Sequence, residues 1–321
     1  MSIMSFIKKI KVRLEYNRNT KAYASHAFSL TQNQSSLDEV LQLSHRLEKG
    51  MVNQNPRMGW GEDKAERLYE LMIHLNDSQP DELFGYKTAL GVLISYIEEK
   101  KRHNDYSDRI KKIDMNLKSI NNTRGSVGGV EYYNRSELII DYNERKKIIN
   151  SILSRHSIRD FSSDSINYSD LFAAIDLANH CPSACNRQPY HVYVISGAER
   201  EKLDTSKVIR ADKYLIITGR ISAFSIEEYN DWLVSASIFA GYLSLCLHIY
   251  NIANCPIRMD LLERAQVYKN IRDYCRIPET EQIILEFAIG NYRDSCCVPK
   301  SNRMNAELLC TICDCKENND D

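Results

Sequence analysis

Residues 181–195 have the sequence Cys-Pro-Ser-Ala-Cys-Asn-Arg-Gln-Pro-Tyr-His-Val-Tyr-Val-Ile. They connect an apolar helical run, Leu171–Ala178, to a strand pattern of alternating β-branched and aromatic residues, Tyr190–Ile195. The small side chains of Ser183 and Ala184 leave room for backbone N–H groups and an Asn side chain to approach a flat ligand. The stretch therefore predicts a helix, a binding loop and a strand in immediate succession.

A dense cationic cluster precedes this loop, with the sequence Arg155-His-Ser-Ile-Arg-Asp-Phe161. A helix predicted over Asp141–Ser154 delivers Arg155, His156, Ser157 and Arg159 to one place. Guanidinium groups are planar, permanently charged donors and suit a phosphate dianion. A basic helix end that balances its own dipole is the alternative interpretation.

Three further blocks follow downstream. A long, mostly apolar helix is predicted over Trp232–Asn251, a strand ended by a glycine lies within Ile277–Tyr292, and a basic pair stands in Val298–Arg303. In this order, over residues 143–303, the blocks resemble the nitroreductase family, whose members bind FMN. The first 130 residues or so lie outside the resemblance.

The resemblance implies an α+β fold, in which helices wrap an antiparallel sheet of about four strands. It also implies a homodimer with two FMN sites at the interface. The domain prediction is a helical N-terminal extension over 1–120, a linker over 121–135, the FMN-binding domain over 136–309 and a cysteine-containing acidic tail over 310–321.

Site residues follow from the same resemblance. It implies that Arg155 and Ser157, with His156 beside them, face the FMN phosphate and ribityl chain, and that Arg159 faces the pyrimidine edge. Contacts to the isoalloxazine and ribityl across the dimer interface are implied for Pro182, Ser183, Ala184 and Asn186. Pro256 and Ile257, in Asn254–Arg258, are implied neighbours of flavin N5, and Lys300 and Arg303 are implied phosphate partners.

One departure from the family concerns the connection between two strands. Only residues 196–213 separate the strand at Tyr190–Ile195 from the next one at Tyr214–Thr218, whereas the family usually has a longer excursion there. The excursion carries extra flavin contacts in the family. The N-terminal extension is the natural candidate to replace it as the substrate-side wall.

The activity implied is reduction of FMN by NAD(P)H, followed by electron transfer to a small organic acceptor in a ping-pong cycle. Flavin N5 does the chemistry, so no catalytic side chain is assigned. Some family members instead dehalogenate, dehydrogenate or fragment flavin. A different interpretation is a protein that has lost FMN and acts as a partner or regulator of enzymes of surface-polysaccharide biosynthesis, because a similar His-x-x-Glu-Lys-Gly extension occurs in nitroreductase-like proteins of that context.

The composition favours a protein that acts on small molecules. Lys and Arg total 42 against 43 for Asp and Glu, so no global field attracts nucleic acid or a membrane. Ten cysteines in a long chain without a secretory signal, several of them within apolar runs, predict a reducing cytoplasm. No membrane span is predicted, because serines and a histidine interrupt the longest apolar helix.

The N-terminal extension is predicted to be helical. A well-capped helix spans Ser36–Gly50, and further helices are predicted over Asp63–Asn76, Asp81–Lys101 and Tyr106–Ile120. His45 and Glu48 lie three residues apart on one helix face, where they form either a hydrogen-bonded surface pair or part of a metal site. A third possibility is that the following loop, Pro56–Gly61, closes over the flavin pocket as a lid or lines the substrate side.

Three other segments leave alternatives open. The basic amphipathic start, Met1–Leu14, either packs on its own protein or rests on an anionic membrane surface. Cys181 and Cys185 are either small packed residues or a redox pair. The tail cysteines 296, 297, 310, 313 and 315 either bind a metal or belong to a reduced tail, and we assign no metal. The glycine-rich residues 121–130 lack the Lys-Ser/Thr ending of a P-loop.

Overall fold

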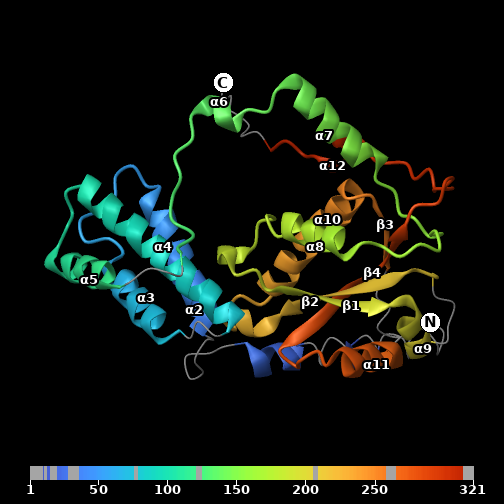
Figure 1. The fold of residues 1–321 in the computed structure, drawn as a ribbon, viewed down its shortest axis with the longest axis horizontal. Helices are drawn as coiled ribbons and strands as arrows, with labels where there is room; N and C mark the ends of the chain where they lie inside the picture. The colour runs from blue at the N-terminus through green and yellow to red at the C-terminus, as the bar shows by residue number, and fades with distance from the viewer. Residues whose placement is uncertain are drawn as a thin grey trace, which may run out of the picture.

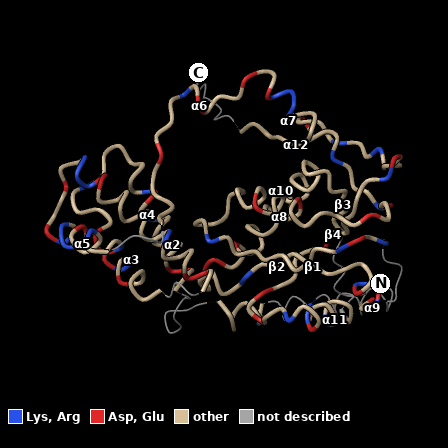
Figure 2. Tube along the Cα trace, in the orientation of Figure 1, with Lys and Arg blue, Asp and Glu red and all other residues tan. Residues whose placement is uncertain are grey.

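A helical module and a sheet domain lie side by side, and a long arm passes from one to the other (Figure 1). The computed structural model describes residues 10, 13–14, 20–27, 36–75, 79–120, 125–204, 209–257 and 265–313. The interpretation of Met1–Leu14 therefore falls largely outside the described residues, as do Arg258 and Cys315. Residues of both charge signs are spread along the module, the sheet domain and the arm (Figure 2).

The module confirms the predicted helices to within about two residues at each end. Its four helices are α2 (Ser36–Met51), α3 (Glu62–His74), α4 (Pro80–Arg102) and α5 (Asp108–Ser119). Their apolar faces form one core, in which α2 contributes Val40, Leu43, Leu47 and Met51. This spacing is that of a single helix face, so the module has a hydrophobic core of its own.

The aromatic loop after α2 packs inside the module. The Trp60 ring lies edge-on to Tyr96, and the Tyr96 hydroxyl donates to the Trp60 carbonyl at 2.5 Å. A Cβ added at Gly50 would lie 2.5 Å from the Trp60 ring, so the glycine makes room for it. Trp60 is therefore a core residue of the module, and the lid interpretation of residues 56–61 stays a prediction for the exposed part of the loop, which includes Met58.

Much of the predicted linker is bound to the module. The Val127 N–H donates to the Lys87 carbonyl at 3.0 Å, and the Gly129 N–H donates to Glu48 Oε1 at 3.1 Å. Val130 N–H donates to Ser95 Oγ, and the Tyr132 hydroxyl donates to Glu99. The described part of residues 121–135 thus leaves the module only after Tyr132.

The sheet domain has four strands, all antiparallel to their neighbours, in the order β1-β2-β4-β3. The strands are β1 (Tyr190–Ser196), β2 (Lys213–Arg220), β3 (Ile252–Ile257) and β4 (Glu281–Asn291). An irregularity between Ile217 and Thr218 shifts the β2–β4 register. With helices around this sheet, the predicted α+β class is confirmed.

Helices cover both faces of the sheet (Figure 1). On one face, α8 (Tyr168–Ala178) and α10 (Asp231–Ile249) pack on alternate strand residues such as Leu215 and Phe287. On the other, α11 (Ala265–Cys275) packs beneath Ile216, next to α9 (Gly197–Leu203). The short 3₁₀ turn η1 (Ala184–Asn186) contacts α10, and the second one, η2 (Ile221–Ala223), contacts β4.

The helix α10 is long and apolar enough to cross a membrane by length and composition alone. Phe239, Leu243 and Leu247 nevertheless lie in the core formed with the sheet and α8. In this fold α10 is a core helix, buried on the side that faces the sheet.

The arm carries many apolar side chains that the chain itself leaves uncovered. It contains α6 (Arg135–Leu138) and α7 (Tyr142–Ser154), and α12 (Ala306–Leu309) of the C-terminal segment runs near them (Figure 1). The exposed large apolar residues of these parts are Leu138, Ile139, Ile140, Tyr142, Ile148, Ile149, Ile152, Leu153, Leu308, Leu309 and Ile312. Exposed apolar side chains in such number are typical of an interface.

The contact of residue 127 with α4 makes a prediction for Gly91. A Cβ there would lie 2.1 Å from the Val127 carbonyl oxygen, so Gly91→Ala should displace the bound segment and lower the free energy of unfolding by about 1–3 kcal/mol. Glu98→Ala, at an exposed position of the same helix, is the control. Urea unfolding measures both. Equal stability of the two variants would contradict the close contact.

Candidate functional site

A hollow of about 490 Å³ lies between the end of α7 and the open side of α10. Arg155 and Ser157 line it from the segment after α7, and Pro256 lines it from the edge strand β3. The remaining lining comes from Ile152, from α10 (Ser237, Ala240, Gly241, Ser244 and Leu245) and from β4 (Leu285 and Phe287). The hollow therefore has a cation and hydroxyls together with a flat apolar wall.

The buried Asn254 side chain joins the elements around this hollow. Ser244 Oγ of α10 donates to Asn254 Oδ1 at 2.9 Å, and Asn254 Nδ2 donates to the Ser244 carbonyl at 3.0 Å. On the same residue, the backbone carbonyl accepts from the Ile158 N–H at 3.0 Å, and Ser157 forms a parallel bridge with it. Because Asn254 is fully buried, these bonds are shielded from water and fix Ser157 beside α10.

The loop 181–189 lies on another side of α10. The Ala184 N–H donates to Ser235 Oγ at 3.1 Å. Ser244, which lines the hollow, follows Ser235 by about two and a half helical turns, so the two side chains point to opposite sides of the helix. Pro182, Ser183, Ala184 and Asn186 are accordingly absent from the lining of the hollow that holds Arg155.

This loop has a strained backbone. Cys185, Asn186 and Gln188 have φ values of 51°, 50° and 46°, which non-glycine residues adopt at a cost. The fully buried Arg187 side chain holds the loop through a two-pronged ion pair with Glu228, at 2.8 and 2.9 Å. The same carboxylate accepts from the Ser225 N–H and hydroxyl. Strain supported by a buried ion pair is common at binding sites.

The helix α2 adjoins this loop, although it belongs to the module. Asp38 of α2 forms an ion pair with Arg220 at the end of β2, with distances of 2.8 and 2.9 Å. His45 stands further along the helix, where burial lowers its pKa and the charges of Lys49 and Arg187 lower it further, against the opposing effect of Glu48. The module is thus fastened beside the predicted binding loop.

His45 and Glu48 form a surface pair in the structure. His45 Nδ1 lies 4.0 Å from Glu48 Oε2, and the other carboxylate oxygen accepts from the Gly129 N–H. The described residues contain no group of three metal-ligating side chains. Glu48 acts as an anchor for the segment that follows α5.

The cysteines of the sheet domain are mostly packed. Cys181 is buried, with its thiol 3.5 Å from the Tyr190 hydroxyl, and Cys185 is half-buried. Burial raises the pKa of the Cys255 thiol, although the charges of Arg159 and Arg155 oppose this effect. A raised thiol pKa lowers the thiolate fraction of Cys255, which favours a packing role for this residue. Cys296, Cys297, Cys310 and Cys313 are exposed.

The other residues expected from the sequence are dispersed. His156 and Arg159 are exposed beside the hollow, and Ile257 packs in a separate small core with Ile158 and Phe161. Lys300 and Arg303 are exposed on the C-terminal segment and do not line the hollow. Sequence reasoning missed the α10 and β4 lining, although the small residues of α10 recur with helical spacing.

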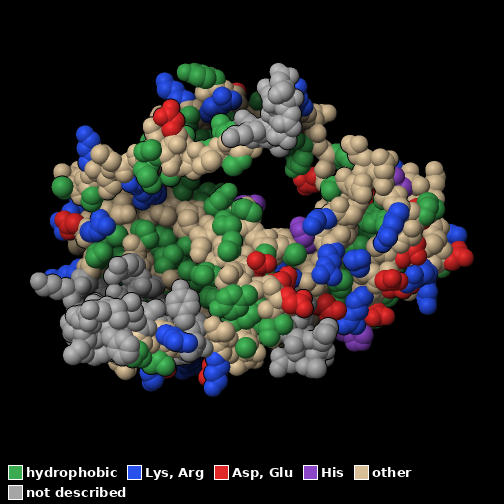
Figure 3. Space-filling model, turned by 180° about the vertical axis from the view of Figure 1, so that it is seen from behind, with side chains coloured by type: hydrophobic (Ala, Val, Ile, Leu, Met, Phe, Trp, Pro, Cys, Tyr) green, Lys and Arg blue, Asp and Glu red, His purple; other side chains and the backbone are tan. Residues whose placement is uncertain are grey.

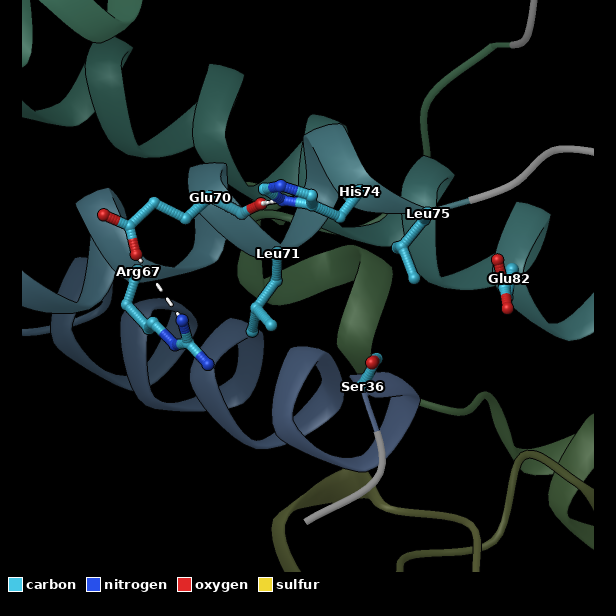
Figure 4. A pocket seen from close by; sticks show the side chains of 7 residues that line it. All are labelled: Ser36, Arg67, Glu70, Leu71, His74, Leu75 and Glu82. Carbon is cyan, nitrogen blue, oxygen red and sulfur yellow. Dashed lines mark hydrogen bonds and ion pairs between the residues drawn. The ribbon is translucent and has the colours of Figure 1, made fainter. Parts of the chain in front are cut away.

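A second hollow, of about 540 Å³, lies within the module (Figure 4). Its lining includes Ser36, Leu71 and His74, and its arginine, Arg67, is paired with Glu39 and Glu70. His74 uses Nδ1 to bond the Glu70 carbonyl of its own helix. None of the residues expected at the cofactor site occurs here.

Comparison with known proteins gives a partial match. Residues 152–215 match the family model described as the nitroreductase family, which confirms the predicted resemblance over that range. Nitroreductase NfnB of Mycolicibacterium smegmatis (strain ATCC 700084 / mc(2)155) is 42% identical over 52 residues, which are 16% of this chain and 22% of that protein. The chain therefore matches less than a quarter of the length of this curated relative.

Solved structures resemble about half of the chain. The putative nitroreductase ydfN from Bacillus subtilis has a TM-score of 0.45 and 15% identity, covering 53% of this chain and 100% of its own. A nitroreductase with bound FMN from Bacteroides fragilis NCTC 9343 has a TM-score of 0.44 and 14% identity. The match covers 52% of this chain and 98% of that chain. The FMN-dependent nitroreductase NfnB from Mycobacterium smegmatis in complex with NADPH has a TM-score of 0.43 and 16% identity. The match covers 53% of this chain and 99% of that chain.

The Arg187–Glu228 pair predicts a pH-dependent contribution to stability. Burial raises the pKa of Glu228, but Arg187 and the Ser225 groups outweigh it, so the pKa lies below its usual 4.5. The stability that the carboxylate supplies is therefore present at neutral pH and is lost as the pH falls through the lowered pKa. Glu228→Gln should cost about 3 kcal/mol at pH 7, because it leaves Arg187 buried without a counter-charge.

The measurement is urea unfolding of both proteins from pH 7 to pH 3. The gap between wild type and Glu228→Gln should narrow below about pH 4.5. Glu227→Gln, at the exposed neighbouring position, is the control and should follow wild type throughout. A gap that is independent of pH would contradict the charge-based account.

Proposed function

We propose that this chain, whose residues 152–215 match the nitroreductase family, is an FMN-dependent oxidoreductase that passes electrons from NAD(P)H to a small organic acceptor. The observation that carries the proposal is the hollow beside α10, because its cationic end is built by Arg155 and Ser157, which lie inside the matched segment. An anionic group fits that end, and a flat ring fits the apolar wall.

FMN suits this set of side chains. Arg155 would hold the phosphate, and the hydroxyls of Ser157 and Ser237 would serve the polar ribityl chain. Pro256 and Phe287 would contact the ring system. Gly241 has open space where a Cβ would stand, so the wall can accept a closely packed ring. Arg159, exposed nearby, remains our assignment for the pyrimidine edge.

This arrangement separates the role of the flavin from the role of the chain. When bound, the flavin supplies the hydride and electron transfer between the two substrates. The chain contributes position and charge: Asn254 holds Ser157 against α10, and the apolar wall excludes water from one side of the ring. No catalytic acid or base is required, and the expected kinetics are ping-pong.

The site is proposed to need two copies of the chain. The hollow and the loop 181–189 face opposite sides of α10, so one chain cannot place both against the same flavin. A second copy can, and the uncovered apolar surface of the arm supports a homodimer. Figure 3 shows an opening between arm and body with hydrophobic side chains along its margin, where a partner can enter.

The residues outside the hollow fit such a dimer. We assign Pro182, Ser183, Ala184 and Asn186 to the flavin bound in the partner's hollow. His156, Lys300 and Arg303 are exposed cations or titratable groups that can complete the phosphate end after association, and Ile257 lies behind Pro256. A cytoplasmic location is our prediction for the enzyme.

Loss of the cation at the hollow should weaken the binding of FMN. Arg155→Ala should raise the dissociation constant for FMN by about 10–100-fold, because a charge-assisted bond to the phosphate is lost. Fluorescence titration with FMN measures this, after the visible spectrum of the purified protein has been recorded with and without NADPH. Arg57→Ala, at an exposed position in the module, is the control. A wild-type protein that takes up no FMN would overturn the proposed function.

Co-expression of two variants tests the shared site. Arg155→Ala removes the phosphate cation, and Pro182→Trp places a large side chain on the loop. At an FMN concentration near the wild-type dissociation constant, each homodimer should therefore bind little FMN. A heterodimer purified through two different tags should bind about one FMN, because one of its two sites receives both intact parts. Absorbance at the flavin band gives the stoichiometry. A colourless heterodimer would place the whole site in one chain, and normal binding by Pro182→Trp would remove the loop from it.

A further inference from the structure

His248, in the last turn of α10, connects three elements at the cationic end of the hollow. Its Nε2 lies 2.9 Å from Ser154 Oγ, at the end of α7, and its Nδ1 lies 2.8 Å from the Tyr292 hydroxyl, just after β4. The ring stands edge-on to Tyr292. Residue 155, the arginine that lines the hollow, directly follows Ser154.

A neutral His248 ring can satisfy both of its partners. The single hydroxyl proton of Ser154 can be donated either to the Ser151 carbonyl, at 3.3 Å, or to His248 Nε2, at 2.9 Å. In both cases the neutral imidazole donates from one ring nitrogen and accepts at the other, toward Ser154 and the Tyr292 hydroxyl. The result is a continuous chain from Tyr292 through His248 to Ser154 and Ser151, which a neutral imidazole completes.

The charges around the ring favour this neutral form. Burial lowers the pKa of His248, and the charges of Arg155 and His156 lower it further. Tyr292, the other titratable group in contact, has its pKa raised by burial and by the nearby Cys296, against Arg155. Both partners thus keep the protonation states that the hydrogen-bond chain requires.

The position of Arg155 depends on how the arm is fastened on either side of it. Before it, Ser154 is held by His248, and after it, Ser157 is held by Asn254. The side-chain hydrogen bonds of Arg145 and Ser151 stay within the arm. The surface of α7 is otherwise largely exposed, so its end is placed mainly by these two attachments.

We propose that His248, supported by Tyr292, is a positioning residue that sets Arg155 at the phosphate end of the hollow and so makes the site select a phosphorylated flavin over riboflavin. The inference rests on the proposed function, since it concerns the same hollow. It adds a part of the site that touches no flavin and acts through Ser154 on the residue that does.

The test compares FMN with riboflavin, which has the same ring system and no phosphate. In His248→Phe, the dissociation constant for FMN should rise about tenfold while that for riboflavin changes less than about twofold, because only the phosphate contact is disturbed. Tyr292→Phe, which removes one oxygen, should give a smaller loss of the same kind. Fluorescence titrations of the full-length protein provide both constants.

Conservative variants separate positioning from packing. In His248→Gln the side-chain amide can replace Nε2 and donate to Ser154, so the preference for FMN should largely return. Tyr193→Phe is the matched control for Tyr292→Phe, because its hydroxyl bonds Glu281 at 3.0 Å, away from the lining of the hollow. It should leave the ratio of the two constants unchanged.

Three outcomes would overturn the inference. If His248→Phe weakened the binding of FMN and of riboflavin equally, the His248 ring would be only a packing element. If the FMN dissociation constant were unchanged in His248→Phe or in Tyr292→Phe, the substituted residue would have no part in the site. A wild-type protein that binds neither flavin would overturn the proposed function and this inference together. If wild type binds FMN but the variants keep the same ratio of the FMN and riboflavin dissociation constants, only the inference is overturned.

Discussion

A long apolar helix covered on one side only governs the architecture of this chain. The sheet and α8 bury one side of α10, whereas Val234, Gly241 and Tyr242 on other sides remain exposed. An exposed apolar surface of this length is costly in water, and the arm adds to it. The proposed association of two copies would remove both costs at once. The hollow beside Ser237 and Ser244 lies on this uncovered side, so the proposed cofactor site and the proposed dimer interface are one feature.

Buried polar contacts determine where the functional segments attach to that helix. Asn254 and Ser244 hold the segment after α7 on the side of the hollow, and Ser235 holds the loop before β1 on the opposite side. Each buried polar group must have a partner, so each attachment permits one arrangement of the neighbouring backbone. In the strained loop, the Arg187–Glu228 ion pair is a further attachment of this kind. Because the charge of Arg187 is buried, the loop has little freedom to adopt another conformation.

The sequence predicted the elements well and their relative placement poorly. Helices such as α2 and α10 and the strands β1 and β2 follow from apolar periodicity and from capping residues, which are local signals. The sequence also grouped Arg155 with Asn186 in one site, but it could not show that α10 separates them within a chain, because that depends on the packing of distant elements. Likewise, Trp60 lies between glycines in a loop-like pattern, and only the module core explains why it is buried.

The helical module takes its place in the proposed site from its attachment to the loop. One face of α2 fills the module core, while Asp38 on another face is paired with Arg220 and the helix adjoins η1. The module is therefore attached directly to the loop. A loop that faces the flavin of the partner brings α2 and His45 toward that same site, and away from the hollow of its own chain. The wall missing between β1 and β2 would then be supplied across the dimer, which requires the Asp38–Arg220 pair to hold the module in register.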